Sequence, residues 1–123
     1  MTTLYVDNHR KPNAKLADVE VALERLDGAQ RTLVLIELPS GPTLTVGGGP
    51  DRFVAEVSES DTVRWAAIHQ ASDDSTIALV VGGQLVDYPA RLCVDRHTVM
   101  EAARTFVRQD GARDPKLMWS RET

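Results

Sequence analysis

The sequence predicts an α+β domain in which an antiparallel sheet of about five to six strands carries two main helices, one N-terminal and one near the C-terminus. Three observations lead to this class. Two segments repeat apolar residues at helical spacing, several β-rich segments lie between them, and a short strand follows the second helix. A run of strands flanked by helices fits this class best. The chain has 123 residues, so we expect a single domain over residues 1–123.

The first helix is predicted near the N-terminus. Its apolar residues recur at three- and four-residue steps: Leu16, Val19, Leu23 and Leu26. Asp18 lies in the first turn, where the helix dipole favours a negative charge. Gly28 follows the last apolar residue and is typical of a helix end.

The chain after this helix predicts a run of strands. The β-rich segments are residues 32–38, 43–46, 52–58, 63–69 and 76–81. Within one of them Phe53, Ala55 and Val57 occupy alternate positions, which predicts one buried and one exposed face. Gly47-Gly48-Gly49 is expected to form a flexible connection between two strands. It is not followed by the Lys-Ser or Lys-Thr pair that a phosphate-binding loop requires.

The second helix shows the clearer pattern. Its apolar stripe follows i, i+3, i+4, i+7, i+8: Val99, Ala102, Ala103, Phe106 and Val107. Asp95 is the predicted N-cap, because its carboxylate can accept from backbone N–H groups two or three residues later. Gly111 is expected to end the helix, and Pro115 prevents its continuation. Residues 116–119 predict a last strand.

Charge is unevenly distributed along the chain. The formal net charge is −4, which disfavours unaided binding to nucleic acid. Residues 1–31 hold five basic and five acidic side chains, residues 32–90 hold two and eight, and residues 91–123 hold seven and five. The negative charge therefore lies in the middle of the chain, where a partner with a basic surface would meet it.

Most catalytic and metal-dependent chemistries are not indicated. Cys93 is the single cysteine and lies in an apolar run, so we expect a small buried residue and no internal disulfide. His9, His69 and His97 are isolated, and the Gly-x-Ser-x-Gly pattern of a nucleophile elbow is absent. We expect no catalytic residues, no cofactor, no metal and no small-molecule substrate.

No segment of the sequence predicts membrane association. The longest apolar stretches, such as residues 33–36 and 77–81, are far shorter than the ~20 residues that cross a bilayer. Residues 1–7 lack the basic start and apolar core of a signal peptide. We expect a cytoplasmic protein with no membrane partner.

The candidate binding residues come from charge and aromatic placement alone. Acidic side chains cluster in and after the segment Glu56-Val57-Ser58-Glu59-Ser60-Asp61, and Trp65 follows as a possible apolar anchor. The candidate contact set is Glu56, Glu59, Asp61, Trp65, Asp73 and Asp74. An acidic surface with no partner is the alternative interpretation of the same residues.

The C-terminal third carries a family resemblance. Val80-Val81-Gly82-Gly83-Gln84-Leu85-Val86-Asp87-Tyr88-Pro89 precedes the second predicted helix, and Asp114-Pro115-Lys116-Leu117-Met118-Trp119 follows it. The order and spacing over residues 80–119, and more loosely over 16–58, resemble the first-numbered immunity protein family of bacterial polymorphic toxin systems. Members of that family include the immunity partner of a toxin that deaminates cytosine in DNA.

The resemblance implies a non-enzymatic inhibitor. Such a protein binds the catalytic domain of a cognate secreted toxin in the producing cell and blocks its active site. The toxins paired with this family are often nucleic-acid deaminases, whose substrate-binding surface must be basic. The alternatives are a non-catalytic interaction module or secretion chaperone and, with less support, a small enzyme that uses the Glu56, Glu59 and Asp61 carboxylates.

Overall fold

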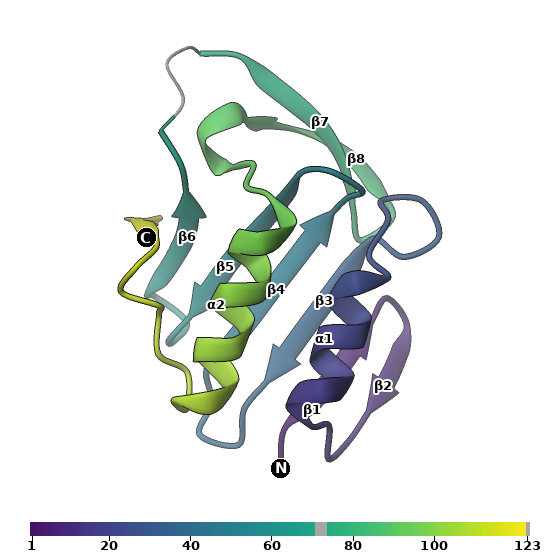
Figure 1. The fold of residues 1–123 in the computed structure, drawn as a ribbon, viewed down its shortest axis with the longest axis vertical. Helices are drawn as coiled ribbons and strands as arrows, with labels where there is room; N and C mark the ends of the chain where they lie inside the picture. The colour runs from purple at the N-terminus through teal and green to yellow at the C-terminus, as the bar shows by residue number, and fades with distance from the viewer. Residues whose placement is uncertain (71–73, 123) are drawn as a thin grey trace.

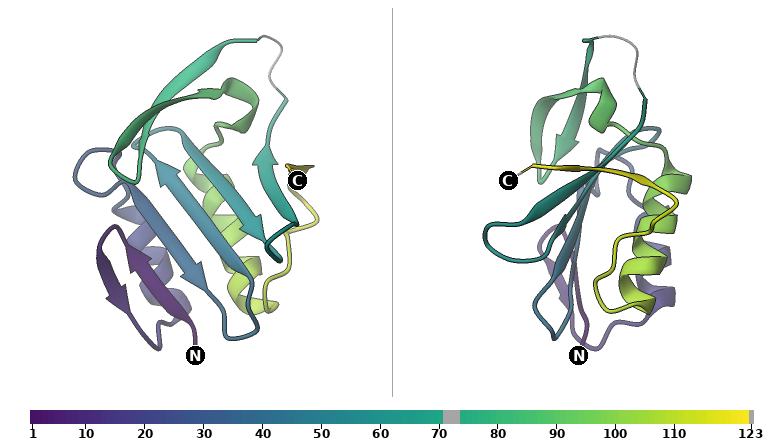
Figure 2. Two further views of the ribbon diagram at one scale, coloured as in Figure 1. Left: turned by 180° about the vertical axis from the view of Figure 1, so that it is seen from behind. Right: turned by 90° about the vertical axis from the view of Figure 1, so that its left-hand side faces the viewer.

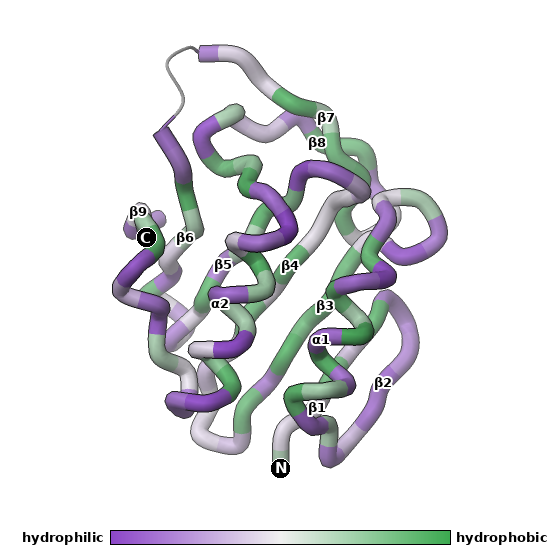
Figure 3. Tube along the Cα trace, in the orientation of Figure 1, coloured by the Kyte–Doolittle hydropathy of each residue, from purple (hydrophilic) through white to green (hydrophobic). Residues whose placement is uncertain are grey.

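The computed structural model describes residues 1–70 and 74–122 of the chain. Figure 1 labels both helices and strands β1 to β8, and Figure 3 labels β9. In chain order they are β1 (Thr3–Val6), β2 (His9–Lys11), α1 (Leu16–Glu24), β3 (Leu33–Glu37), β4 (Thr43–Gly48), β5 (Phe53–Ser58), β6 (Arg64–Ile68), β7 (Thr76–Val81), β8 (Gln84–Pro89), the 3-10 turn η1 (Ala90–Leu92), α2 (Arg96–Arg108) and β9 (Met118–Arg121).

The strands form a seven-stranded sheet and a separate two-stranded hairpin. The order in the large sheet is β2-β1-β3-β4-β5-β6-β9, and β7 pairs with β8. Adjacent strands pair in antiparallel fashion. The predicted α+β class with two helices and an antiparallel sheet is therefore confirmed, but the predicted strand number is too low.

The strands that the sequence did not predict are β1, β2 and β8. The three residues of β2 are all exposed and charged or polar, and most of β8 is exposed as well. Neither strand has the apolar alternation that marks a half-buried strand. Their strand conformation depends on backbone pairing with β1 and β7, which no local sequence pattern reveals.

Both helices pack on one face of the large sheet, as the side view in Figure 2 shows. The core lies between the two layers and includes alternate residues of the central strands: Val34, Ile36, Leu44, Val46, Phe53, Ala55 and Val57. The alternation predicted for β5 is confirmed, with Phe53, Ala55 and Val57 at most 2% exposed. Figure 3 shows this apolar centre as the green stretches of β3, β4 and β5 behind the helices.

The boundaries of α2 agree with the sequence, whereas α1 ends at Glu24, before the predicted Leu26 and Gly28. At the start of α2 the Asp95 carboxylate accepts from the Thr98 backbone N–H at 2.9 Å, which confirms the predicted N-cap. This hydrogen bond lowers the pKa of Asp95. Beyond the other end, Gly111 has a φ of 93° and donates to the Phe106 carbonyl at 2.8 Å. That left-handed conformation is typical of a glycine helix stop.

The glycines between β4 and β5, which we expected to form a flexible connection, are closely packed. Gly47 and Gly48 belong to β4 and are buried, and Gly49 lies against the chain that follows α1. A Cβ atom on Gly28 would lie 2.3 Å from the Gly49 carbonyl oxygen. Glycine is therefore needed here for close contact between two backbones rather than for mobility.

Arg96 joins this contact to α2. Its guanidinium donates to the carbonyls of Leu23 and Leu26 and, at 3.1 Å, to that of Pro50. It also lies over the Phe53 ring, 4.8 Å from the centroid. The last carbonyls of a helix have no partner within the helix. One side chain of α2 thus satisfies the end of α1 and fixes the turn after β4.

We predict that Arg96→Met lowers the free energy of unfolding by about 3 kcal/mol, because charged hydrogen bonds to three carbonyls are lost together. Urea denaturation measures this change. Arg108→Met is the matched control, since Arg108 is an exposed arginine at the end of the same helix. Equal losses in the two variants would contradict the structural role of Arg96.

The β7–β8 hairpin is attached to the large sheet through β4. A Cβ atom on Gly47 would lie 2.4 Å from Cγ1 and 3.1 Å from Cβ of Val81. Leu79 contacts the neighbouring position, 3.2 Å from a Cβ built on Gly48, and is 6% exposed. The hairpin therefore depends on the absence of a side chain at Gly47 for its position.

We predict that Gly47→Ala costs about 1–3 kcal/mol of stability, because Val81 is branched at Cβ and cannot move away easily. Adding Val81→Ala should recover part of that loss. A double-mutant cycle measured by urea denaturation tests this coupling. If the two effects simply add, the hairpin is not positioned by this contact.

Candidate functional site

The face of the large sheet opposite the helices is the main surface that no helix covers. Register places Thr45 of β4, Glu56 of β5 and Ala66 of β6 side by side on it. The β7–β8 hairpin stands beside one end of this face, on the side away from the helices (Figure 2). We call this surface, together with the hairpin, the open face.

A cavity of about 190 Å³ lies between the sheet and the hairpin on the open face. Strands β4, β5, β6, β7 and β8, the turn η1 and the C-terminal segment all contribute to it. Its lining residues are Thr45, Val54, Ala55, Glu56, Ala66, Val81, Tyr88, Leu92 and Glu122. The charged groups among them are two carboxylates, which gives the cavity an acidic character.

The carboxylates of this cavity have exposed partners. Glu56 lies 3.7 Å from Arg64, and the two side chains are 39% and 47% exposed. An ion pair this exposed contributes little. Glu122 accepts from the Ser120 hydroxyl at 3.1 Å. Burial raises the pKa of Tyr88, with smaller effects from Cys93 and Glu56. The phenol therefore remains a neutral hydrogen-bonding group at physiological pH.

The hairpin itself presents apolar side chains to solvent. Leu85 is 72% exposed and Val86 is 36% exposed, both on β8. In the part of the chain that the structure describes, β8 pairs with β7 alone, so its other edge has no strand beside it. Asp87 follows these residues and is also exposed. Apolar residues next to acidic ones at a free strand edge are typical of a binding surface.

The predicted contact residues do not form one patch in the structure. Glu56 lies on the open face, whereas Trp65 pairs with Val57 and so faces the helix layer. Glu59 and Asp61 lie in the turn before β6, and Asp74 lies after it, next to β7. The five residues of β6 separate these two ends by about 16 Å. Asp73 lies outside the described residues.

Two of these predicted residues have partners within the chain. The Arg113 guanidinium lies 3.8 Å from the centroid of the Trp65 ring, and its Nε donates to Glu59 at 3.3 Å. One face of Trp65 is therefore covered, and the charge of Glu59 is partly balanced. Trp65 Nε1 is buried and has no hydrogen-bond partner among the described residues. Asp61 and Asp74 remain exposed to solvent.

The sequence did not single out Tyr88, Leu85, Val86 and Glu122 as contact residues. The exposure of Leu85 and Val86 depends on β8 being an outer strand, and that strand was not predicted. Glu122 joins the cavity because its backbone N–H donates to the Arg64 carbonyl at 2.9 Å, beside β9. In the sequence, the apolar residues Leu85 and Val86 directly before Asp87 and Tyr88 were the signal that could have indicated this surface.

The contacts of Cys93 and His69 are with the surrounding fold. Cys93 is 0% exposed, as predicted, and burial raises the pKa of its thiol. His69 Nε2 lies 2.7 Å from the Ala90 carbonyl oxygen. Within residues 1–70 and 74–122, no group of three or more His, Cys, Asp or Glu side chains is arranged to hold a metal ion.

Neither α1 nor α2 of the described chain is long and apolar enough to span a bilayer.

The comparisons with known proteins give one family. No curated protein matches the sequence. The family described as Immunity protein Imm1 matches residues 11–121, from the end of β2 to the end of β9. This match confirms the immunity-protein resemblance of residues 80–119 and extends it over nearly the whole chain. The chain belongs to the Imm1 family of immunity proteins.

Proposed function

We propose that this protein protects the cell that makes it by binding the catalytic domain of a cognate bacterial toxin and blocking its active site. Family membership supports the immunity role. The observation that carries the binding surface is the open face, where an acidic cavity adjoins a hairpin with exposed Leu85 and Val86. This role requires tight binding and no catalysis by the chain itself, and its proposed location is the cytoplasm.

The composition of the open face suits a protein partner with a basic surface. Protein interfaces combine an apolar centre with a polar rim. Here Val86 lies on the side of β8 that carries Tyr88, towards the Glu56 and Glu122 carboxylates, and Leu85 and Asp87 lie on the other side of the strand. Complementary charge speeds association and excludes partners of the wrong sign. Asp61 and Asp74 extend the negative charge to both ends of β6.

We propose a nucleic-acid deaminase as the toxin class. An enzyme that acts on a base in DNA or RNA must hold the phosphate backbone, so basic side chains surround its pocket. Carboxylates of the open face would occupy the positions that phosphates take in the substrate complex. Glu59 belongs to this proposed contact surface through the turn before β6, with Arg113 moving away or bridging to the toxin, whereas Trp65 faces the helix layer and lies outside the surface.

A secretion chaperone is the second candidate, and the free edge of β8 favours it. An exposed strand edge can pair with an extended segment of an unfolded client. The two functions differ in the state of the bound toxin. An immunity protein binds the folded catalytic domain and abolishes its activity, whereas a chaperone binds the unfolded chain and leaves the released enzyme active.

The experiment that tests the proposed function is co-expression with the toxin encoded beside this protein. We expect growth to be restored. We also expect the protein to copurify with the folded catalytic domain as a one-to-one complex in which the toxin is inactive. A catalytically inactive toxin serves as the control for expression. Toxicity that persists despite soluble expression of both chains contradicts the proposal.

We predict that Leu85→Ser raises the dissociation constant for the toxin domain at least tenfold, because the substitution removes the most exposed apolar contact that β8 offers a partner. The melting temperature should stay within about 1 °C of the wild type, since a surface substitution at a 72% exposed residue has little effect on folding. Surface plasmon resonance and thermal unfolding measure the two quantities. Unchanged affinity places the interface elsewhere.

Charge reversal maps the extent of the interface. We predict that Glu56→Lys and Asp61→Lys each slow association several-fold at low salt, and that this difference shrinks as the salt concentration rises. Glu24→Lys is the matched control, because Glu24 is exposed at the end of α1, in the helix layer. Stopped-flow association rates distinguish these outcomes. If all three variants slow association equally, the effect comes from net charge alone and the acidic residues of the open face have no specific role.

A further inference from the structure

The helix layer is narrower than the sheet that it covers. Seven strands spaced about 4.8 Å apart place the outermost strands about 29 Å from each other. Two helices packed side by side cover only about 20 Å. On the β6–β9 flank, the chain after α2 fills the gap, with Arg113 on the Trp65 ring and the Trp119 indole donating to the Asp114 carbonyl at 2.9 Å.

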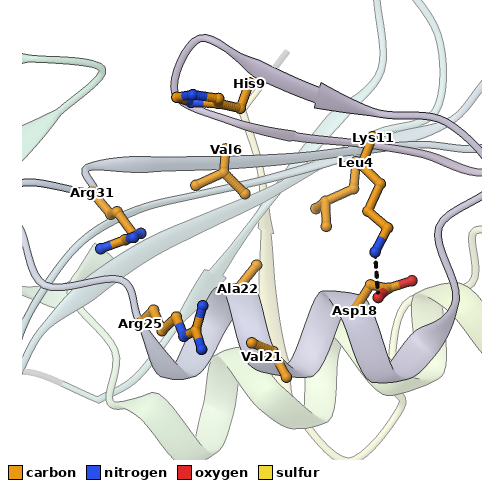
Figure 4. A pocket seen from close by; sticks show the side chains of 9 residues that line it. All are labelled: Leu4, Val6, His9, Lys11, Asp18, Val21, Ala22, Arg25 and Arg31. Carbon is orange, nitrogen blue, oxygen red and sulfur yellow. Dashed lines mark hydrogen bonds and ion pairs between the residues drawn. The ribbon is translucent and has the colours of Figure 1, made fainter.

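The opposite flank, over β1 and β2, has no such cover. There the structure contains a groove of about 360 Å³ between α1 and the β1–β2 hairpin, which we call the flank groove (Figure 4). Leu4 and Val6 of β1 and Val21 and Ala22 of α1 supply its apolar wall. Val21 is 48% exposed, which is unusual for a valine in the middle of a helix.

Basic side chains surround this apolar wall. His9, Lys11, Arg25 and Arg31 line the groove, and Asp18 is the one acidic residue among its lining. Lys11 and Asp18 form an ion pair at 2.8 Å, and this contact is the main cause of the lowered pKa of Asp18. For Arg25 and Arg31, no side-chain ion pair or hydrogen bond joins them to another residue within the described ranges. The flank groove is therefore positively charged.

The positive region continues beyond Arg31. A second cavity of about 410 Å³ shares Val6, His9 and Arg31 with the flank groove. The carboxylate of Asp7, which also lines it, is occupied by hydrogen bonds from the backbone N–H and hydroxyl of Thr32, at 3.2 and 2.9 Å. Asp7 is thus committed to an internal contact, and Asp27, whose charge also acts on Arg31, accepts from the backbone N–H groups of Ala29, Gln30 and Arg31.

We propose that the flank groove is a second docking surface, which takes an amphipathic helix with acidic flanks from a partner protein. Such a helix would lie beside α1 as a third member of the helix layer. Its apolar stripe would cover Val6, Val21 and Ala22, and its carboxylates would meet Arg25 and Arg31. The basic toxin surface proposed for the open face has the wrong charge for this groove, so the two surfaces bind different chemistry.

A displayed peptide library tests this proposal with the isolated protein. Each member is a 16-residue alanine-rich helix with leucines at i, i+3 and i+7, and with Glu or Lys drawn at random at the flanking positions. We expect selection on the wild-type protein to enrich Glu over Lys beside the leucine stripe. The most enriched peptide, carrying a fluorophore, then provides dissociation constants by anisotropy.

Matched variants locate the binding. We expect Arg25→Gln with Arg31→Gln to weaken the enriched peptide at least tenfold, and Val21→Ala to weaken it about threefold or more. The control is Arg10→Gln with Arg108→Gln, which removes the same charge. Arg10 lies on β2 but pairs with Tyr5 and so faces away from the groove. We expect the control to change affinity less than twofold, and thermal unfolding checks that all variants fold.

Several results would overturn the proposal: no enriched peptide, enrichment of Lys, or equal weakening by the two double variants. A homodimer of the protein that the Arg25 and Arg31 variants dissociate would assign the flank groove to a second copy instead. The outcome is separate from the proposed function. The Arg25→Gln and Arg31→Gln protein should still protect cells from the toxin, whereas Leu85→Ser should still bind the acidic helix.

Discussion

The arrangement of this protein depends on one guanidinium group. Arg96, in the first turn of α2, donates to the Leu23 carbonyl in the last turn of α1, to the Leu26 carbonyl just after that helix and to the carbonyl of Pro50, and it stacks on Phe53 at the start of β5. It thereby joins both helices and the turn between two central strands at a single point. The contact is possible only because Gly28 and Gly49 let two backbones approach each other without side chains between them. At the other end of the helix pair, Arg104 reaches Glu20 of α1 at 2.9 Å and holds the two helices together.

Fixing both helices over the central strands determines which surfaces remain for binding. The sheet is wider than the helix pair, so one whole face and one flank stay uncovered. The open face is acidic and carries the exposed apolar residues of β8, whereas the flank groove is lined by basic residues. A net charge of −4 conceals this separation, because positive and negative side chains gather on different sides of the molecule. A binding protein with two surfaces of opposite sign can hold two different partners at once.

The β7–β8 hairpin connects the fold to its proposed function. It lies outside the large sheet and contacts it where Val81 meets Gly47, and most of β8 is exposed to solvent. A glycine at this one position lets the hairpin approach the open face and enclose a small cavity with Tyr88 on one wall and Glu56 on the other. A chain of 123 residues thus forms a concave surface between the sheet and the hairpin.

The sequence by itself determined the fold class, the two helices, the cap and the stop of α2, the strands of the core and the family. These features follow from local patterns: the spacing of apolar residues in α2, the Asp95 cap, and the alternation of Phe53, Ala55 and Val57. Only the tertiary structure decided which strands form edges, how the acidic residues divide between two faces, and that Arg113 covers Trp65. The physical reason is that a short exposed strand is stabilised by its partner strand rather than by its own side chains. The face on which a carboxylate lies depends on strand register, and register is set by pairing across the sheet.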